Sequence, residues 1–387
     1  MFERIEVRVG SFVSGVELVV PVFKFKGRDP QSPKTYVQAN IHGAELQGIA
    51  VAYRLIEYLS KHPPLGDVTI VPSANPHGSN MKVGEYTQGR FSTVTGENFN
   101  RAYFDLVGDG SPSETSKGSE RFVDLADFVD RFRGEDSSRI GSAFRDALRG
   151  ALDAIRTQMI EWGAAPERRL ALEIQSMSID ADIVLDLHTG SRAPLYIYAP
   201  RFTFESVRWF RIPHVLLIPV DFSGSLDEAS FRPWWRLHAA LKEAGREDMP
   251  VGVEAFTIEL ESQERFDLDR ADDQLHHILG YLRHRGALGG EPLPPEDEPA
   301  YCSLENYRTI YSPVSGWADY QVQPGSRVRA GDVTVRIFQL PKLRTAADLQ
   351  SCLHEVKAPK DGIVLTIFAS SAVHEGAELF KLMTEVS

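Results

Sequence analysis

The amino-acid sequence predicts an α/β fold, a mixed β-sheet flanked by helices, followed by a small all-β domain. Two patterns support this. Between residues 5 and 71, runs with strand periodicity precede and follow a segment with helical periodicity, and this order is typical of an α/β sheet. Beyond residue 300, only short strand-like runs and glycine turns occur. The length of 387 residues is also enough for two domains.

The first elements follow from the spacing of apolar residues. Alternating apolar and polar residues at 5–9 and 16–25 predict antiparallel strands. A strand at 36–41 leads into a helix at about 44–59, where apolar residues recur every three or four positions. A further strand is expected at 68–71, directly before Pro72.

The middle of the chain changes composition. Gly, Ser, Asp and Glu dominate residues 105–139, which predicts a long acidic insertion at the surface. Beyond it, apolar spacing predicts a helix near 140–160, strands at 181–187, 215–220 and 251–260, and a closing helix at 271–285.

These elements define the predicted domains. The α/β domain is expected at 1–288, and a Pro- and Glu-rich linker at 289–299 stays extended. The β domain at 300–387 contains a weak internal repeat, since Pro313-Val314-Ser315-Gly316 resembles Pro359-Lys360-Asp361-Gly362. Two similar halves indicate a small sandwich or barrel.

Composition limits the classes of partner and compartment. The formal net charge of −12 argues against a nucleic-acid partner but allows a small anionic substrate beside local arginines. Two cysteines, Cys302 and Cys352, make neither a disulfide framework nor a Cys-type zinc site, and reduced thiols favour a cytoplasmic protein. We also expect no signal peptide and no membrane span.

A candidate metal site begins at His42 and Glu45. His42 is expected where a strand ends and Glu45 in the first turn of the next helix, so both side chains lie at the carboxyl edge of the sheet. Imidazole and carboxylate suit zinc. A His-x-x-Glu pair alone is weak evidence, and the alternative is a loop histidine and a glutamate that favours the helix dipole.

The strand at 181–187 ends in a second polar pair, Asp186 and His188. Residues two apart on a strand share a face, so Asp186 could orient His188 by accepting its second N–H. The alternative is a polar pair at a strand end whose hydrogen bonds are satisfied and which has no role in a site. Two histidines and one glutamate leave a fourth position for water, which is typical of catalytic zinc.

Glu259 is a charge inside an otherwise apolar strand, which is unfavourable without a partner or a role. It could serve as general base, or it could be a solvated residue at a strand end. Glu254 is its rival, and strand alternation puts the two on opposite faces. Arg90 and Arg101 could bind a carboxylate or an oxyanion, although each alone could be an ordinary surface arginine.

Five short motifs taken together resemble the succinylglutamate desuccinylase/aspartoacylase family of the zinc carboxypeptidase-like superfamily. The resemblance covers residues 36 to 261. The motifs, in order, are His42-Gly43-Ala44-Glu45, Asn75-Pro76-His77-Gly78, Asn98-Phe99-Asn100-Arg101, Asp186-Leu187-His188 and Thr257-Ile258-Glu259-Leu260.

The resemblance implies a zinc carboxypeptidase-like fold with one Zn²⁺ per chain, held by His42, Glu45 and His188. It also implies roles for four further residues: Glu259 as general base, Arg90 at the scissile carbonyl, and Asn100 with Arg101 at a substrate carboxylate. His77 falls in the variable place of its motif, and we expect a loop residue that is not a ligand.

Two regions depart from what the resemblance carries over. Residues 356–364 resemble part of a biotinyl/lipoyl-type barrel-sandwich, but Lys342 does not match a carrier lysine, which favours a structural or site-shaping role. Glu261 stands where relatives often have glycine, and the acidic insertion is long. Both could change the pocket, so the substrate does not follow by analogy.

We therefore expect an amide hydrolase, foremost an N-acyl amino acid deacylase acting on a small carboxylate-bearing substrate. A metallocarboxypeptidase for short peptides is the alternative. A non-catalytic zinc- or ligand-binding protein is a third, against which Glu259 beside a complete ligand set argues. The sequence leaves a homo-oligomer open.

Overall fold

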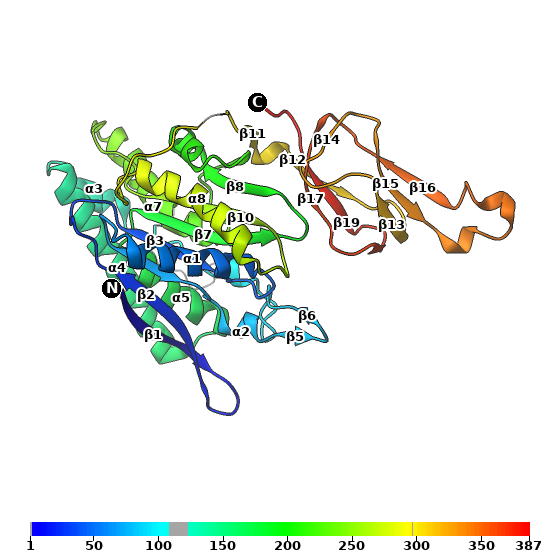
Figure 1. The fold of residues 1–387 in the computed structure, drawn as a ribbon. Helices are drawn as coiled ribbons and strands as arrows, with labels where there is room; N and C mark the ends of the chain where they lie inside the picture. The colour runs from blue at the N-terminus through cyan, green and yellow to red at the C-terminus, as the bar shows by residue number, and fades with distance from the viewer. Residues whose placement is uncertain (1, 108–122, 296) are drawn as a thin grey trace.

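A computed structural model describes residues 2–107, 123–295 and 297–387 of the chain. Its larger part is a nine-stranded mixed sheet, which confirms the predicted α/β fold (Figure 1). The order is β1-β2-β4-β3-β7-β10-β8-β9-β11. The strands are β1 Phe2–Ser11, β2 Glu17–Phe25, β3 Thr35–Ala39, β4 Val68–Val71, β7 Ile183–Gly190, β8 Leu195–Pro200, β9 His214–Ile218, β10 Glu254–Ser262 and β11 Ala300–Ser303.

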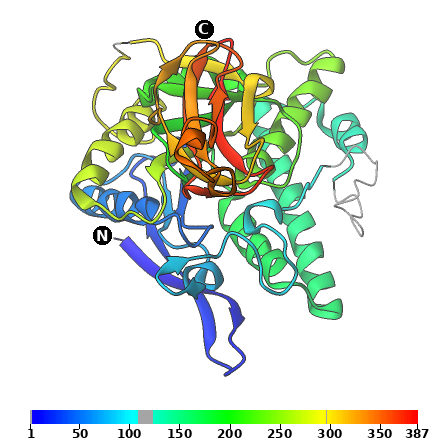
Figure 2. The ribbon, with the colours of Figure 1, turned by 90° about the vertical axis from the view of Figure 1, so that its right-hand side faces the viewer.

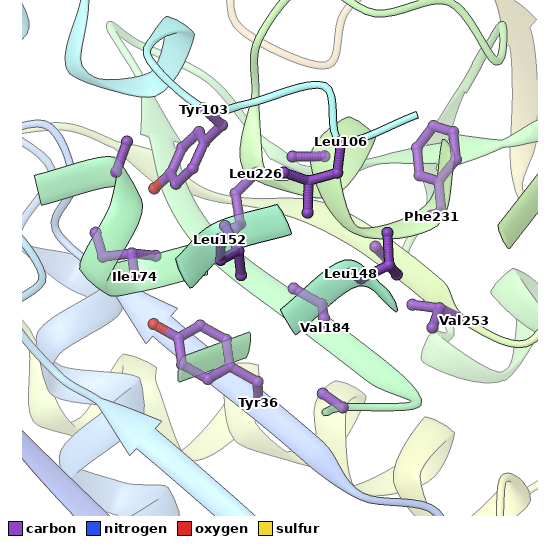
Figure 3. Packing of buried hydrophobic residues seen from close by; sticks show 14 of the residues in the cluster. Tyr36, Tyr103, Leu106, Leu148, Leu152, Ile174, Val184, Leu226, Phe231 and Val253 are labelled. Carbon is purple, nitrogen blue, oxygen red and sulfur yellow. The ribbon is translucent and has the colours of Figure 1, made fainter. Parts of the chain in front are cut away.

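Helices cover both faces of this sheet. One face packs against α1 (Gln47–Lys61) and α8 (Leu268–His284). The other face packs against α4 (Ser137–Trp162), α5 (Pro166–Ser178) and α7 (Leu226–Glu243). Figure 3 shows part of the second core, to which the sheet contributes Tyr36 and Val184 and the helices Leu148, Leu152, Ile174 and Phe231. Both faces being buried explains the continuous apolar runs in β7 and β10.

The centre of the sheet determines where the polar side chains meet. The strands β4, β3, β7 and β10 are parallel neighbours, so their carboxyl ends lie at one edge. The pair β10–β8 is antiparallel. The sequence analysis did not predict β8, α5 or α7, although β8 is a short apolar run and the buried residues of α5 recur at helical spacing.

Two local predictions need correction. The helix expected from residue 44 begins at Gln47, so Glu45 lies in the preceding loop and not in the first helical turn. The segment 105–139 is not entirely at the surface, because α3 (Leu125–Phe132) buries Phe128 and Val129 in the core. Residues 108–122 of this segment lie outside the described residues.

The C-terminal strands form two four-stranded sheets around a separate apolar core. One sheet contains β12 (Tyr307–Tyr311), β19 (Glu378–Met383), β17 (Gly362–Ile367) and β14 (Arg327–Val328). The other contains β16 (Leu353–Lys357), β15 (Val333–Phe338), β13 (Gly316–Tyr320) and β18 (Ala372–Val373). Figure 2 shows them in front of the upper half of the α/β part.

The two parts contact each other near the carboxyl end of β7. Arg192 forms a β-bridge with Ile367, and a shared apolar cluster includes Tyr196, Ile363 and Met383. Because β11 pairs with β9, the chain beyond the linker first adds a strand to the large sheet. The domain boundaries at 288 and 300 stay predictions.

Among the helices in the described residues, none combines the length and the apolar composition that crossing a membrane requires.

Candidate metal centre

Side chains from three neighbouring parallel strands meet at one edge of the sheet. His42 follows β3, His188 lies near the end of β7, and Glu259 lies near the end of β10, in register with His188. Ligands of α/β folds bind at this edge, outside the carboxyl ends of the strands. Ligand atoms of the buried residues His42, Glu45 and His188 all lie within 4.8 Å of one another. Long-range strand order thus brings together residues that are 146 positions apart in sequence.

Both imidazoles turn the same ring nitrogen toward Glu45. His42 Nδ1 lies 2.9 Å from Glu45 Oε1, and His188 Nδ1 lies 2.7 Å from Glu45 Oε2. The other ring nitrogen of His42, Nε2, lies 2.8 Å from Asn98 Oδ1. His188 Nε2 lies 2.8 Å from Asp186 Oδ2, an ion-pair distance without hydrogen-bond alignment. The two Nδ1 atoms and the carboxylate therefore converge.

This donor set fits a zinc ion. Zinc takes imidazole nitrogen and carboxylate oxygen, and three protein ligands are the pattern of catalytic sites. Histidine ligands in such sites usually make a second contact through the other ring nitrogen, as Nε2 does here with Asn98 and Asp186. The three residues could hold one ion.

Charge state also favours cation binding. Burial acts to raise the pKa of Glu45, but the two imidazoles outweigh it and hold that pKa well below its ordinary value. Burial lowers the pKa of His42. For His188, burial acts to lower the pKa, but the charges of Asp186 and Glu45 raise it well above its ordinary value. The pocket thus compensates a buried carboxylate with positive charge, which a metal ion can replace.

A buried polar chain supports His188 from behind. Asp186 Oδ1 accepts a hydrogen bond from Gln38 Nε2 at 2.9 Å, and Gln38 Oε1 accepts one from Tyr36 at 3.1 Å. All three are fully buried. Gln38 lies in register with Asp186 on the neighbouring strand. Gln38 was not predicted from the sequence, where only its polar side chain in an apolar strand was a signal.

Three glycines allow the loops around the centre to cross in close contact. A Cβ on Gly43 would lie 2.2 Å from the carbonyl oxygen of Gly78, and one on Gly89 would lie 2.3 Å from the same oxygen. The Gly43 N–H donates to the Gly89 carbonyl at 3.1 Å. This crossing gives a physical reason for glycine in the His-Gly-x-Glu and Asn-Pro-x-Gly motifs. It also fixes the position of Arg90.

Arg90 lies beside the ligand group. Its Nη2 donates to Glu45 Oε1 at 2.7 Å, while about half of its side chain is exposed. Asn100 is buried, with Nδ2 3.3 Å from His188 Nε2. Arg101 is exposed and donates to the Asn100 carbonyl at 2.6 Å. Arg90 and Asn100 thus contact the ligand residues directly, and Arg101 lies one residue further along the same turn.

Glu259 is the one of the two candidate carboxylates that faces the centre. Its Oε2 is buried and has no hydrogen-bond partner among the described residues. Burial first, and then the charge of Glu45, raise the pKa of Glu259 to about 7. Glu254 lies at the other end of β10, where it pairs with Arg285 and accepts a hydrogen bond from Tyr281. Its contacts are structural.

Glu261, which follows the Glu-Leu pair in place of glycine, has a backbone conformation that favours glycine. Its φ is +69°, in a bulge where the pairing of β10 with β7 shifts register. A non-glycine residue in this region costs about 1–2 kcal/mol. Glu261 forms an ion pair with Arg270 at 2.6 Å, which offsets part of that cost. His77 was expected in a loop, but it lies in the short helix α2 (Pro76–Ser79), where its ring stacks on Phe99.

A family model and several solved structures are similar to this chain. Residues 31–285 match the family model of the succinylglutamate desuccinylase/aspartoacylase catalytic domain. A succinylglutamate desuccinylase/aspartoacylase structure from Shewanella frigidimarina NCIMB 400 is 36% identical with a TM-score of 0.91, and covers 100% of this chain and 98% of its own. One from Shewanella amazonensis SB2B is 39% identical with a TM-score of 0.90, and covers 100% and 99%.

More distant structures share the fold alone. The ectoine utilization protein EutE (DoeB) of Ruegeria pomeroyi, in a product-bound structure, is 16% identical with a TM-score of 0.64. It covers 99% of this chain and 94% of its own. A comparison with curated proteins gave no match.

Proposed function

The chain belongs to the succinylglutamate desuccinylase/aspartoacylase family, and we propose that it is a zinc-dependent hydrolase that removes an acyl group from an N-acyl amino acid. The observation that carries this proposal is the buried group His42, Glu45 and His188, with the unpartnered Oε2 of Glu259 at the same edge of the sheet. A metal-binding protein without catalysis has no need of that fourth side chain.

One zinc ion held by His42, Glu45 and His188 would supply an acidified water and a positive charge for the carbonyl oxygen. Glu259 takes a proton from the attacking water at Oε2 and delivers it to the leaving amine. A pKa of about 7 suits a group that accepts and returns a proton near neutral pH.

Arginine and asparagine side chains hold the substrate in this proposal. Arg90 donates to the carbonyl oxygen as negative charge develops on it, since its guanidinium already lies at the ligand group. Asn100 and Arg101 bind the carboxylate of the amino acid, because guanidinium and carboxylate match in shape and charge. Asp186 keeps the ring of His188 in place.

The alternative is a metallocarboxypeptidase for short peptides, which uses the same ligands. The test is a panel of N-succinyl and N-acetyl amino acids and dipeptides, offered to the zinc-loaded protein, with release of free amine as the measurement. We expect release from N-acyl amino acids and much less from dipeptides. Release chiefly from dipeptides would support the alternative.

The same panel tests the non-catalytic hypothesis. A protein that binds zinc in a 1:1 ratio and releases no amine from any member of the panel would contradict the proposed hydrolysis. The variant Glu259→Gln is the control for contaminating hydrolases, because it should keep zinc and lose the release.

A further inference from the structure

Asn40 has an uncommon backbone conformation directly before the ligand loop. It lies between the end of β3 and His42, is fully buried, and has a φ of +62°. Among residues with a side chain, asparagine tolerates this left-handed region best, at a cost that other residues exceed. Its side chain makes contacts that glycine could not make.

The amide nitrogen of Asn40 faces the carbonyl oxygens of the loop that carries two of the proposed ligands. Nδ2 lies 3.0 Å from the carbonyl of His42, 3.2 Å from that of Gly43 and 3.4 Å from that of Glu45. A single donor group therefore fixes both ends of the turn from His42 to Glu45. The backbone of each residue determines where its side chain can point.

Two hydroxyl groups lie at the other end of the amide. Asn40 Oδ1 accepts hydrogen bonds from Ser73 at 3.1 Å and from Ser79 at 2.5 Å. The backbone carbonyls can only accept, so Nδ2 must face them and Oδ1 faces the hydroxyls, which can donate. Ser73 follows β4 and Ser79 ends α2 (Pro76–Ser79), so Asn40 links the ligand loop to the neighbouring Asn-Pro-x-Gly loop.

We propose that Asn40 is a positioning residue of the metal centre, which holds His42 and Glu45 in the arrangement that binds the ion by bonding their backbone carbonyls. It touches none of the ligand atoms and acts through the loop alone. This inference rests on the proposed function, because it requires that the group His42, Glu45 and His188 holds zinc.

The test compares zinc affinity and geometry in Asn40→Asp and Asn40→Gly. Aspartate has the same shape but places an oxygen against three carbonyl oxygens, while glycine accepts the φ and removes the bonds. The control is Asn80→Asp, since Asn80 is exposed and its side chain donates to the Pro76 carbonyl in its own helix turn, away from the ligand loop. The measurements are competition with a chromogenic zinc chelator and the visible spectrum of the Co²⁺-substituted protein.

We expect Asn40→Asp to weaken zinc binding by about 10–100-fold, the range for residues that orient metal ligands, and to change the Co²⁺ spectrum. Asn40→Gly should weaken it less, and Asn80→Asp should match the wild type. If Asn40→Asp does not fold, Asn40→Gly decides the matter, with weaker zinc binding expected.

If the Asn40 variants keep wild-type zinc affinity and an unchanged Co²⁺ spectrum, even with lower stability, Asn40 has only a structural role. That result would overturn this inference but not the proposed function. A wild-type chain that binds no zinc would instead overturn the proposed function, and the inference with it.

Discussion

The crossing of glycine loops makes a quantitative prediction for Gly43→Ala. The added Cβ would lie 2.2 Å from the oxygen and 2.6 Å from the carbon of the Gly78 carbonyl, and 2.7 Å from the Gln88 carbonyl oxygen. These atoms are backbone, so no rotamer change relieves the contact. Reaching an ordinary separation of about 3.4 Å requires a shift of about 1 Å between the loops.

Overpacking of this kind costs about 1–3 kcal/mol, occasionally more, and we expect the upper part of that range because the obstacles cannot rotate. Zinc affinity should also fall, since the displaced residue lies between the proposed ligands His42 and Glu45. The backbone of Gly43 does not adopt positive φ, so the prediction rests on contact alone.

The assay is urea denaturation of the metal-free protein together with competition for zinc by a chromogenic chelator. The control is Gly134→Ala, where a Cβ would meet no heavy atom within 4 Å and φ is not left-handed. A Gly43→Ala protein within about 0.5 kcal/mol of the wild type, the scatter of ordinary surface substitutions, and with equal zinc affinity would refute the reasoning.

Four further predictions concern single side chains. Glu259→Gln should keep zinc but lose turnover by about 10²–10⁴-fold, and near-normal turnover would exclude it as general base. His188→Ala should lose zinc, measured by metal content after gel filtration, while the matched variant His77→Ala retains it; zinc retained by both would exclude His188 as a ligand. Glu261→Val should be less stable than Glu261→Gly by at least about 1 kcal/mol in urea, because a β-branched residue fits a φ of +69° poorly; equal stabilities would contradict this. Burial first, and then a neighbouring negative charge, raise the pKa of Asp227 to about 6. The stability that the protonated Asp227 contributes is therefore full below its unfolded pKa of about 3.9, and up to about 3 kcal/mol of it is lost as pH rises through 6. Asp227→Asn should remove that part of the pH dependence from denaturation curves.

Much of the architecture followed from local periodicity. The strands that end at His42, His188 and Glu259 were expected because apolar runs of strand length ended in polar residues, and the structure confirms the fold. The start of α1 was misplaced by three residues because helical spacing of apolar residues includes Leu46, whereas the carbonyls of His42, Gly43 and Glu45 lie at the Asn40 amide and outside the helix. Strand β8 and helices α5 and α7 were not predicted, although the run Leu195–Ala199 is apolar and of strand length.

The sequence by itself determined which residue types reach the edge of the sheet, because strand and helix periods depend on near neighbours in the chain. It also determined the family, through five motifs in order. Only the tertiary structure decided that β10 lies between β7 and β8, which sets Glu259 in register with His188, and that both oxygens of Glu45 face an imidazole Nδ1. The positioning contacts of Asn40 and Gln38 likewise join segments far apart in sequence. Such pairings depend on the packing of the whole sheet, which no local pattern encodes.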